Sequence, residues 1–498
     1  MRLNLLIIIA SFSIQFIYPQ NVTFYMRIED EKFLPIEQEQ IKKDGIETLE
    51  VKTRSETFNS VLSQSKIKKF SQAFPIVKDE WLQKVYLVES EESLYKNLTE
   101  AKFNNEISHI ELLCEPSLCY TPNDYSLSYN QTNLDLIKVK DAWDIVRTLP
   151  KLPIGVTDTY FDKTHPDLQN QFINIVGNSS PDGHGTAVAG LLSAQTDNAI
   201  GISAISFNAK IYASTNWGSD NEVLSLAQQG YRVINCSWHN SCSYSVIQDS
   251  LYKKIRDVWN TIVVFSAGNV ASHCGSLTAK VYPASYSSVL SVTSVGHMKP
   301  VGYIDPQWGT ADWIDCHEAV VGDPTSSHHH NDAVDICAPG YHVPTTLYGG
   351  GYGGAWGTSF AAPQVAATAC LVLSVNPCLS AQQAMNIIKN SADPSIYSIS
   401  YNAPYIGLLG TGRLDVAAAC LAAAQSATQT FSTPTILLGT QTIETNYAIE
   451  NTASVQIVSG ANILFKTRKE VILNAGFEVA VGATFEIDVD SNNVINCN

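Results

Sequence analysis

Three polar residues of the central region stand in settings that suit nucleophilic catalysis. Asp158 ends the mostly apolar run 153–157, His184 lies between two glycines, and Ser359 opens an apolar helical stretch. A carboxylate can hold an imidazole in one tautomer, and the imidazole can then take the proton of a serine hydroxyl. At a helix N-terminus, unpaired N–H groups favour negative charge on a substrate oxygen. The sequence therefore predicts a triad of Asp158, His184 and Ser359.

Each of these residues by itself has a more ordinary explanation. Asp158 resembles a turn residue, His184 a histidine of a glycine-rich turn, and Ser359 a helix cap. Their settings and their order together indicate a triad. The order Asp, His, Ser along the chain differs from that of chymotrypsin and of the α/β-hydrolases. The Gly-x-Ser-x-Gly elbow of an esterase or lipase is also missing.

Three motifs resemble the active-site motifs of the subtilisin-like (S8, subtilase) serine peptidases, over about residues 131–424. They are Thr157-Asp158-Thr159, His184-Gly185-Thr186 and Gly357-Thr358-Ser359-Phe360-Ala361-Ala362-Pro363. The resemblance implies a serine endopeptidase that hydrolyses polypeptide substrates through an acyl-enzyme. In that mechanism Ser359 is the nucleophile, His184 is the general base and then the general acid, and Asp158 orients His184.

Two further segments match parts of the family's substrate site. Ala267-Gly268-Asn269 follows a buried-type strand, and the resemblance implies that Asn269 and the Ser359 N–H form the oxyanion hole. Asn235-Cys236-Ser237-Trp238 is similar to the strand end that pairs with substrate. Ser237, Trp238, Ala267 and Gly268 would then border the pocket for the residue before the scissile bond. Because these segments carry no charge, we expect a broad or apolar-leaning preference.

Two residues depart from the family pattern. Tyr160 and His239 stand where the family commonly has glycine, and a bulky side chain at His239 would narrow a cleft in which glycine lets a peptide lie close. This leaves a second hypothesis, a cell-surface binding or adhesion protein with a protease-like fold and a blocked cleft. Reaction of the mature protein with a fluorophosphonate probe separates the two hypotheses.

Short β-branched runs alternate with helical patterns between residues 134 and 424. Strands are predicted at 154–157, 210–213, 233–236, 261–265 and 289–295, and helices after His184, at 221–229, at 246–259 and after Ser359. Such alternation predicts an α/β fold with a doubly wound, mostly parallel sheet covered by helices on both faces. Active sites in such folds lie at the carboxyl ends of the strands, where Asp158 is found.

The flanking segments have a different character. Residues 21–120 show a β, α, β order typical of a small α+β unit. The resemblance implies that this unit is a propeptide, which inhibits the enzyme by covering its cleft until the propeptide is removed. After a linker at 425–435, alternation on both sides of Gly482 predicts a hairpin in an all-β module at 436–498. Its segment 474–485 is similar to a repeated β module of secreted Bacteroidota proteins. The peptidase domain itself is expected at 121–424.

Composition limits the location and the partners. The net charge of -16 argues against a nucleic-acid partner, which needs clustered lysine and arginine. Residues 1–20 have the outline of a secretory signal peptide and are too short to span a membrane comfortably, although an uncleaved anchor stays an alternative. Eleven cysteines suit an exported protein that is secreted or displayed at the cell surface. Cys114 and Cys119, Cys236 and Cys242, and Cys370 and Cys378 are close in sequence, which leaves the disulfide pairing open.

The predicted chemistry requires no cofactor, so a bound metal ion would have a structural role. Asp167 and the loop 196–202 resemble parts of a structural calcium site in subtilisins, where hard oxygen ligands bind the ion. The run His328-His329-His330 suggests a transition metal at first sight. It lacks a helical ligand spacing, so we expect a solvated loop instead.

Overall fold

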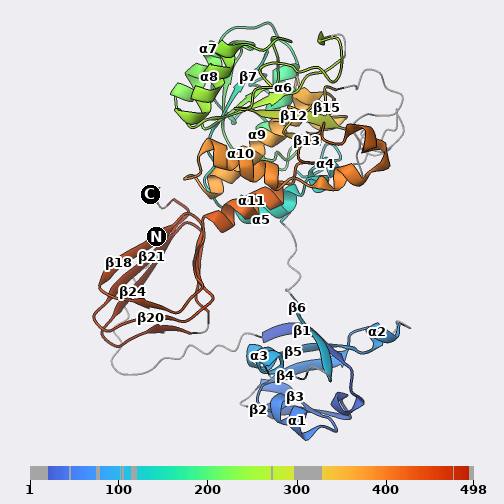
Figure 1. The fold of residues 1–498 in the computed structure, drawn as a ribbon, viewed down its shortest axis with the longest axis vertical. Helices are drawn as coiled ribbons and strands as arrows, with labels where there is room; N and C mark the ends of the chain where they lie inside the picture. Colours follow the sequence, from blue (N-terminus) through green and yellow to red (C-terminus); the bar gives the residue numbers. More distant parts are fainter. Residues whose placement is uncertain are drawn as a thin grey trace. The chain divides into compact units, whose positions relative to one another are not determined.

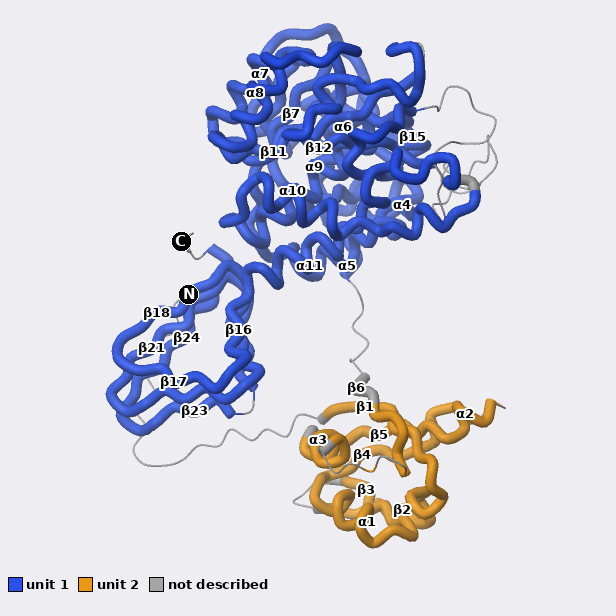
Figure 2. The backbone as a smooth tube through the Cα atoms, viewed as in Figure 1, with its two compact units in different colours: residues 1–8, 119–498 blue, residues 9–118 orange. Residues whose placement is uncertain are grey.

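The computed structural model describes residues 21–43, 46–74, 79–100, 103, 106–113, 120–270, 273–296, 328–474 and 476–492. The chain divides into two compact units, of which one contains residues 119–498 and the other residues 9–118 (Figure 2). The predicted signal peptide, Cys114 and Cys119 lie outside the described residues.

A seven-stranded sheet forms the centre of the larger unit, in the order β13-β12-β11-β10-β7-β9-β8 (Figure 1). All of its neighbouring strands run parallel. The strands are β7 (Ile154–Thr157), β8 (Phe172–Val176), β9 (Ile211–Ser214), β10 (Val233–Cys236), β11 (Ile262–Ser266), β12 (Leu290–Val295) and β13 (Ile336–Pro339). The prediction of a doubly wound, mostly parallel α/β sheet is confirmed, and each predicted strand lies within one residue of an observed one.

The side chains of alternate residues in the central strands pack into two separate cores, one on each face of the sheet. Val264 of β11 belongs to the larger core, whereas Phe265, the next residue, belongs to the smaller one. This is the period of two that a strand imposes on its side chains. It explains why every residue of β10 and β11 is buried, since both faces of the sheet are covered.

Helices cover both faces of this sheet. The helices are α4 (Thr132–Leu136), α5 (Val139–Val146), α6 (His184–Ser193), α7 (Asp220–Gln228), α8 (Val246–Asp257), α9 (Thr358–Val375), α10 (Ala381–Asn390) and α11 (Val416–Ser426). Helices α6 to α9 lie within two residues of their predicted positions. Helices α4, α5, α10 and α11 were not predicted, although the capping box of Ser380 and Gln383 marks the start of α10.

The central helix of the unit is α9, which begins beside the predicted active site. All of its residues are buried, and a helix that is apolar all round belongs in a core. Among the described residues it is also the one helix whose length and apolar composition would allow it to cross a membrane.

The last part of the chain forms a parallel β-solenoid. Its three sheets are β16 (Gln429–Phe431), β19 (Ala448–Asn451) and β22 (Glu470–Ile472); β17 (Thr435–Leu437), β20 (Val455–Ile457) and β23 (Phe477–Val479); and β18 (Thr440–Thr445), β21 (Asn462–Thr467) and β24 (Thr484–Val489). Asn462 pairs with Thr484, 22 positions later, so each coil lies on the one before it. Ile457 and Phe465 fill the interior.

The predicted hairpin around Gly482 is therefore wrong. β23 and β24 lie in different sheets, and each pairs in parallel with a strand of the preceding coil. Alternation of apolar and polar residues reports which side chains face inward, but it does not report the partner strand. The predicted linker 425–435 also contains the end of α11 and all of β16.

The N-terminal unit is a small α+β structure. Its four-stranded antiparallel sheet has the order β4-β5-β1-β6, with β1 (Asn21–Ile28), β4 (Ile67–Gln72), β5 (Val85–Glu91) and β6 (Ile107–Leu113). The other strands and α-helices are the pair β2 (Glu37–Lys43) and β3 (Ile46–Lys52) and the helices α1 (Glu56–Leu62), α2 (Glu80–Gln83) and α3 (Glu92–Glu100). Phe24, Phe58 and Leu94 are among its core residues.

Candidate active site

Asp158 and His184 meet where the winding of the sheet changes direction. Asp158 directly follows β7, which pairs with β9 on one side and β10 on the other. His184 is the first residue of α6, and its Nδ1 lies 2.6 Å from Asp158 Oδ1. The Asp158 carboxylate is 2% exposed, whereas the His184 ring is 32% exposed, so one side of the imidazole faces out of the core.

The turn around His184 is held by close backbone packing. A Cβ at Gly185 would lie 2.6 Å from the carbonyl oxygen of Tyr160, so only glycine fits there. Asp182 Oδ1 accepts hydrogen bonds from the His184 N–H at 2.6 Å and from the Thr159 hydroxyl at 3.0 Å. These contacts fix the imidazole against Asp158 before any substrate arrives.

The electrostatic surroundings make His184 a stronger base. Burial lowers the pKa of His184, but the charge and hydrogen bond of Asp158, with a contribution from Asp182, outweigh it and raise the pKa above its usual value. Asp158 Oδ2 is buried and has no hydrogen-bond partner among the described residues. Asp158 Oδ1 also accepts a hydrogen bond from the Thr159 N–H at 2.7 Å, so both hydrogen bonds of the carboxylate end on the oxygen that faces His184.

Ser359 is the second residue of α9 and is 7% exposed. The ring of Phe360, the next residue, lies 5.3 Å from the ring of His184, so the start of α9 packs against the imidazole. The Ser359 hydroxyl donates to the Ser237 carbonyl oxygen at 3.3 Å. Within the described residues it forms no hydrogen bond with His184; such contacts often tighten only in the substrate complex.

Asn269 is oriented by the residue before Ser359. Its Oδ1 accepts hydrogen bonds from the Thr358 N–H at 2.9 Å and from the Thr358 hydroxyl at 3.1 Å. The other atom of the amide, Nδ2, is thereby left as a donor beside the N-terminus of α9. The Ser359 N–H lies in the first turn, where helical N–H groups lack a helical partner.

The four predicted pocket residues differ in the contacts that their side chains and backbones make. Ser237 donates its hydroxyl to the Ser359 carbonyl at 2.8 Å, and the Gly268 N–H donates to the Thr358 hydroxyl at 3.1 Å. Ala267 is buried beside them. The Trp238 indole turns into the core, where it donates to the Thr157 hydroxyl at 2.7 Å, so only its backbone is available to substrate.

The two bulky departures from the family pattern pack against other rings. Tyr160 lies 5.7 Å from Tyr348, and His239 lies 4.0 Å from His273, ring centre to ring centre. Burial, followed by the proximity of His273 and His329, lowers the pKa of His239 to about 4. His239 is therefore uncharged at neutral pH.

A disulfide joins Cys242 to Cys274 and closes the loop that carries His273. The sequence pointed to no such pair, because the two cysteines are 32 positions apart. Cys236 and Cys370 are buried thiols, so the near neighbours Cys236 and Cys242 do not pair, and neither do Cys370 and Cys378.

The expectation of a solvated histidine loop is wrong. His328, His329 and His330 are 2%, 0% and 7% exposed, because the segment lies against the turn of Gly268 and Asn269. No group of three or more histidine, cysteine or acidic side chains in the described part of the chain is arranged to hold a metal ion.

Two buried carboxylates gather at the loop that resembles a calcium site. Asp124 and Asp167 are both 0% exposed, and Asn198 bridges them, with its N–H 3.0 Å from Asp124 Oδ2 and its Nδ2 2.9 Å from Asp167 Oδ1. Burial first, and then the charge of Asp124, raise the pKa of Asp167 to about 7. Asp124 was not predicted as part of this site, because it is distant from the loop along the chain.

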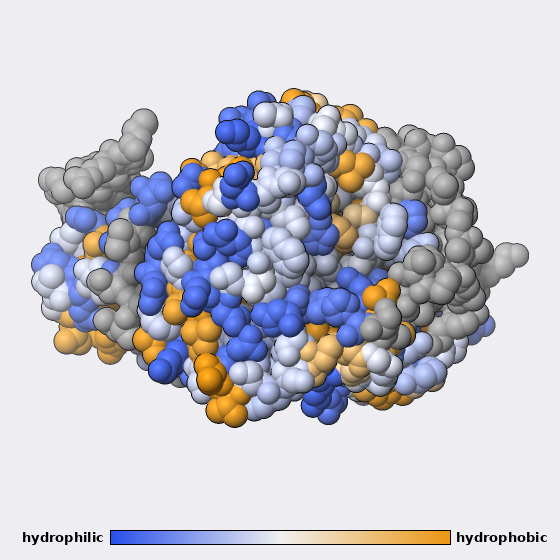
Figure 3. Space-filling view, turned by 90° about the horizontal axis from the view of Figure 1, so that it is seen from above, coloured by the Kyte–Doolittle hydropathy of each residue, from blue (hydrophilic) through white to orange (hydrophobic). Residues whose placement is uncertain are grey.

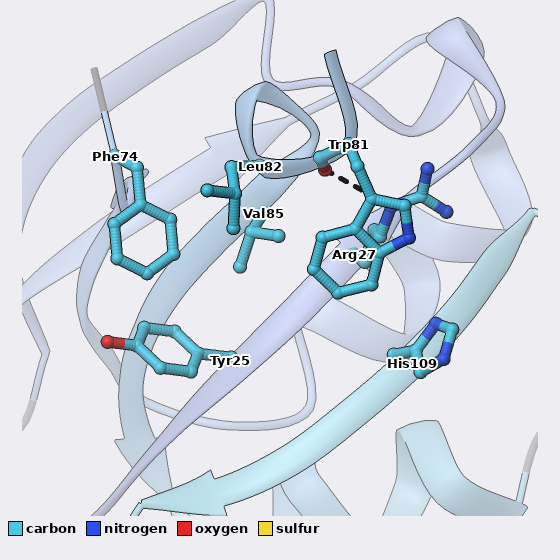
Figure 4. Close-up of a pocket in the computed structure, with 7 residues that line it drawn as sticks. All are labelled: Tyr25, Arg27, Phe74, Trp81, Leu82, Val85 and His109. Atoms are coloured by element: carbon cyan, nitrogen blue, oxygen red, sulfur yellow. Dashed lines mark hydrogen bonds between the residues drawn. The ribbon is translucent and has the colours of Figure 1, made fainter. Parts of the chain in front are cut away.

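The N-terminal unit has a pocket of about 200 Å³ of its own (Figure 4). Arg27 lies over the Trp81 ring at 4.8 Å and donates from Nε to the Trp81 carbonyl oxygen. The lining is mostly apolar and consists of Tyr25, Arg27, Phe74, Trp81, Leu82, Val85 and His109. These lining residues include no carboxylate and no serine, although the Ser108 hydroxyl lies 2.9 Å from His109 Nδ1.

Residues 151–451 match the model of the Subtilase family. Thermitase from Thermoactinomyces vulgaris is 30% identical over 292 residues, which are 55% of this chain and 92% of thermitase. Subtilisin E from Bacillus subtilis is 27% identical over 301 residues, which are 57% of this chain and 72% of that protein. Among solved structures, that of proteases from Pseudoalteromonas arctica has 21% identity and a TM-score of 0.47, and covers 61% of this chain and 100% of its own.

Proposed function

Because the chain belongs to the subtilase family and is a subtilisin-like serine endopeptidase, we propose that Asp158, His184 and Ser359 are its catalytic triad. The observation that supports this best is the 2.6 Å contact between His184 Nδ1 and the buried Asp158 carboxylate, next to the start of α9. It leaves Nε2 as the ring nitrogen that takes a proton from Ser359.

The proposed reaction proceeds through an acyl-enzyme. His184 removes the Ser359 hydroxyl proton while Oγ attacks the carbonyl carbon of the scissile peptide bond. The tetrahedral intermediate collapses as His184 gives that proton to the leaving amine, which breaks the C–N bond. Water, activated by His184, then hydrolyses the ester and restores Ser359. Asp158 stabilises the imidazolium at both stages without itself taking a proton.

Asn269 is the proposed second donor to the oxyanion. The hydrogen bonds that Thr358 gives to Asn269 Oδ1 leave the Nδ2 hydrogens for the substrate oxygen. Together with the Ser359 N–H they form a preorganised pair of donors, which costs no reorganisation when charge develops. Ser237, Ala267, Gly268 and the backbone of Trp238 form the proposed pocket, which has uncharged walls.

Calcium is a proposed structural ion rather than a reactant. Asp124 and Asp167 are buried, and neither forms an ion pair with a lysine or arginine of the described residues. Two uncompensated carboxylates together with the carbonyls of the loop 196–202 fit the oxygen ligands that calcium prefers. Asp124, Asp167 and Asn198 would hold the ion and bring the N-terminal lead-in of the domain against the loop.

The organisation of the chain supports synthesis as a secreted zymogen. We interpret residues 1–20 as a signal peptide, the separate unit up to residue 120 as the inhibitory propeptide, and residues 121–424 as the peptidase domain. The solenoid, which begins at β16 and includes the predicted module 436–498, is proposed to serve in surface display. The expected location is therefore outside the cell or on its surface.

A binding or adhesion protein with a blocked cleft is the competing function. Tyr160 and His239 pack against neighbouring aromatic rings, which gives no support for an obstruction by either residue. The face in Figure 3 mixes hydrophilic and hydrophobic residues, and its apolar groups are small rather than one continuous adhesive surface.

Replacement of the nucleophile tests the proposed function. We expect Ser359→Ala to abolish casein digestion and labelling by a fluorophosphonate probe, while circular dichroism stays that of the wild type. Ser276→Ala, at an exposed loop hydroxyl, is the control and retains both activities. Equal digestion by wild type and Ser359→Ala would refute the proposed triad.

A further inference from the structure

Asp182 is an acidic side chain at the rim of the proposed active site, and it has no cationic partner among the described residues. The residue is exposed, and its two hydrogen bonds, from the His184 N–H and the Thr159 hydroxyl, both end on Oδ1. Oδ2 accepts no hydrogen bond from the described residues, and no described lysine or arginine forms an ion pair with Asp182. One carboxylate oxygen is therefore committed to the turn, and the other is available.

Two aromatic rings lie beside the same turn. Tyr348 is 51% exposed, and its Cβ lies 3.9 Å from the place where Gly183 would carry a side chain. Tyr160 packs edge to face against Tyr348 at 5.7 Å. An aromatic face next to a carboxylate attracts an ammonium or guanidinium group by both charge and ring quadrupole.

We propose that Asp182 is a specificity-determining residue, whose free carboxylate oxygen binds a lysine or arginine side chain of the substrate beside His184. The inference rests on the proposed function, because the cation must belong to a peptide lying across Ser359 and His184. The walls of the pocket before the scissile bond are uncharged, so this preference belongs to a neighbouring position of the substrate. Tyr160 and Tyr348 would contact the aliphatic part and the charge of the same side chain.

Asp182→Asn isolates the charge from the structural role. Asparagine keeps an Oδ1 that can accept the hydrogen bonds from His184 and Thr159, and it is as good a cap as aspartate at a helix start. Only the negative charge is lost. Asp182→Glu restores the charge on a longer side chain. Asp257→Asn, at the end of α8 and paired with Arg256, is the control for loss of one carboxylate elsewhere on the surface.

The experiment uses the processed wild-type enzyme and fluorogenic peptides of one parent sequence. Lysine, leucine or glutamate is placed in turn at each of the three positions on either side of the scissile bond, and kcat/KM is measured. At one position we expect kcat/KM of the lysine peptide to exceed that of the leucine peptide by roughly threefold to tenfold. This is the size expected of an exposed ion pair with an aromatic neighbour. The ratio falls toward one in Asp182→Asn and in high salt.

Three results would overturn the inference. They are a lysine to leucine ratio of one at all positions in the wild type, a ratio that Asp182→Asn leaves unchanged, and a loss of leucine-peptide cleavage in Asp182→Asn as large as that of the lysine peptide. The last result would show that Asp182 acts only by positioning His184. Failure of the proposed function looks different, because Ser359→Ala would then cleave every peptide as well as the wild type does.

Discussion

Thr358 holds the side-chain amide of Asn269 through two hydrogen bonds, one from its N–H at 2.9 Å and one from its hydroxyl at 3.1 Å. Both end on Oδ1, so the amide has one orientation, with its N–H groups directed away from Thr358. Thr358 thus sets the direction of the proposed oxyanion donor, Asn269. Thr358 and the proposed nucleophile Ser359 both belong to the N-terminal turn of α9.

Replacement of Asn269 by alanine is expected to reduce kcat while KM changes little. The donor contacts the oxygen only when it carries charge, so its loss affects the transition state more than the bound substrate. In subtilisin itself such a loss costs roughly 100- to 1000-fold in turnover, and we expect that order here. Steady-state kinetics on one peptide measure it. A tenfold rise in KM with unchanged kcat would assign Asn269 to substrate binding instead.

The acid limb of the pH profile should lie above the usual pKa of histidine. His184 must be neutral to act as a base, and the net effect of its surroundings raises its pKa, so activity is lost as pH falls through that raised value. Asp182→Asn removes one of the influences that raise the pKa. Its acid limb in kcat/KM should therefore move to lower pH, with Asp257→Asn unchanged. A shift to higher pH would contradict the assigned electrostatics.

Removal of calcium is expected to destabilise the enzyme without changing its chemistry. EDTA should lower Tm by several degrees, since bound ligand stabilises the folded state by mass action. Asp167 must lose its proton to bind the ion, and its pKa is about 7 without metal, so calcium affinity should weaken as pH falls below that value. Thermal scans at pH 6 and pH 8, with and without EDTA, measure this.

Asp124→Asn tests whether this residue contributes to the proposed calcium site. The amide is similar in size to the carboxylate but removes one of the two buried charges, so the effect of EDTA on Tm should shrink. A wild-type Tm that is the same with calcium and with EDTA at pH 8 would refute the site.

Loss of the Cys242–Cys274 disulfide should lower stability more than activity. The bond closes a loop across 32 positions, for which the chain-entropy model gives about 3 to 4 kcal/mol. We expect the double variant Cys242→Ser, Cys274→Ser to lower the free energy of unfolding by up to that amount. Denaturant titration of the Ser359→Ala background avoids self-digestion. An unchanged unfolding midpoint would show that the loop is held by packing alone.

Secondary structure near the site followed closely from the sequence. The strand at Ile154–Thr157 and the helix after His184 lie where the pattern predicted them, because a buried parallel strand and a helix start have local signatures. β8 was missed because it carries exposed residues such as Ile173 and lacks a continuous apolar run. The order of Asp158, His184 and Ser359 identified the family that the comparisons support.

Contacts between distant segments could be decided only by the tertiary structure. The sequence by itself determined five of the seven strands of the parallel sheet, the helices α6 to α9 and the candidate residues, since these depend on local pattern. The inward turn of Trp238, the pairing of Cys242 with Cys274, the meeting of Asp124 with Asp167 and the stacking of β24 on β21 all depend on which surfaces come together. Packing in three dimensions sets those partners, and no spacing along the chain encodes them.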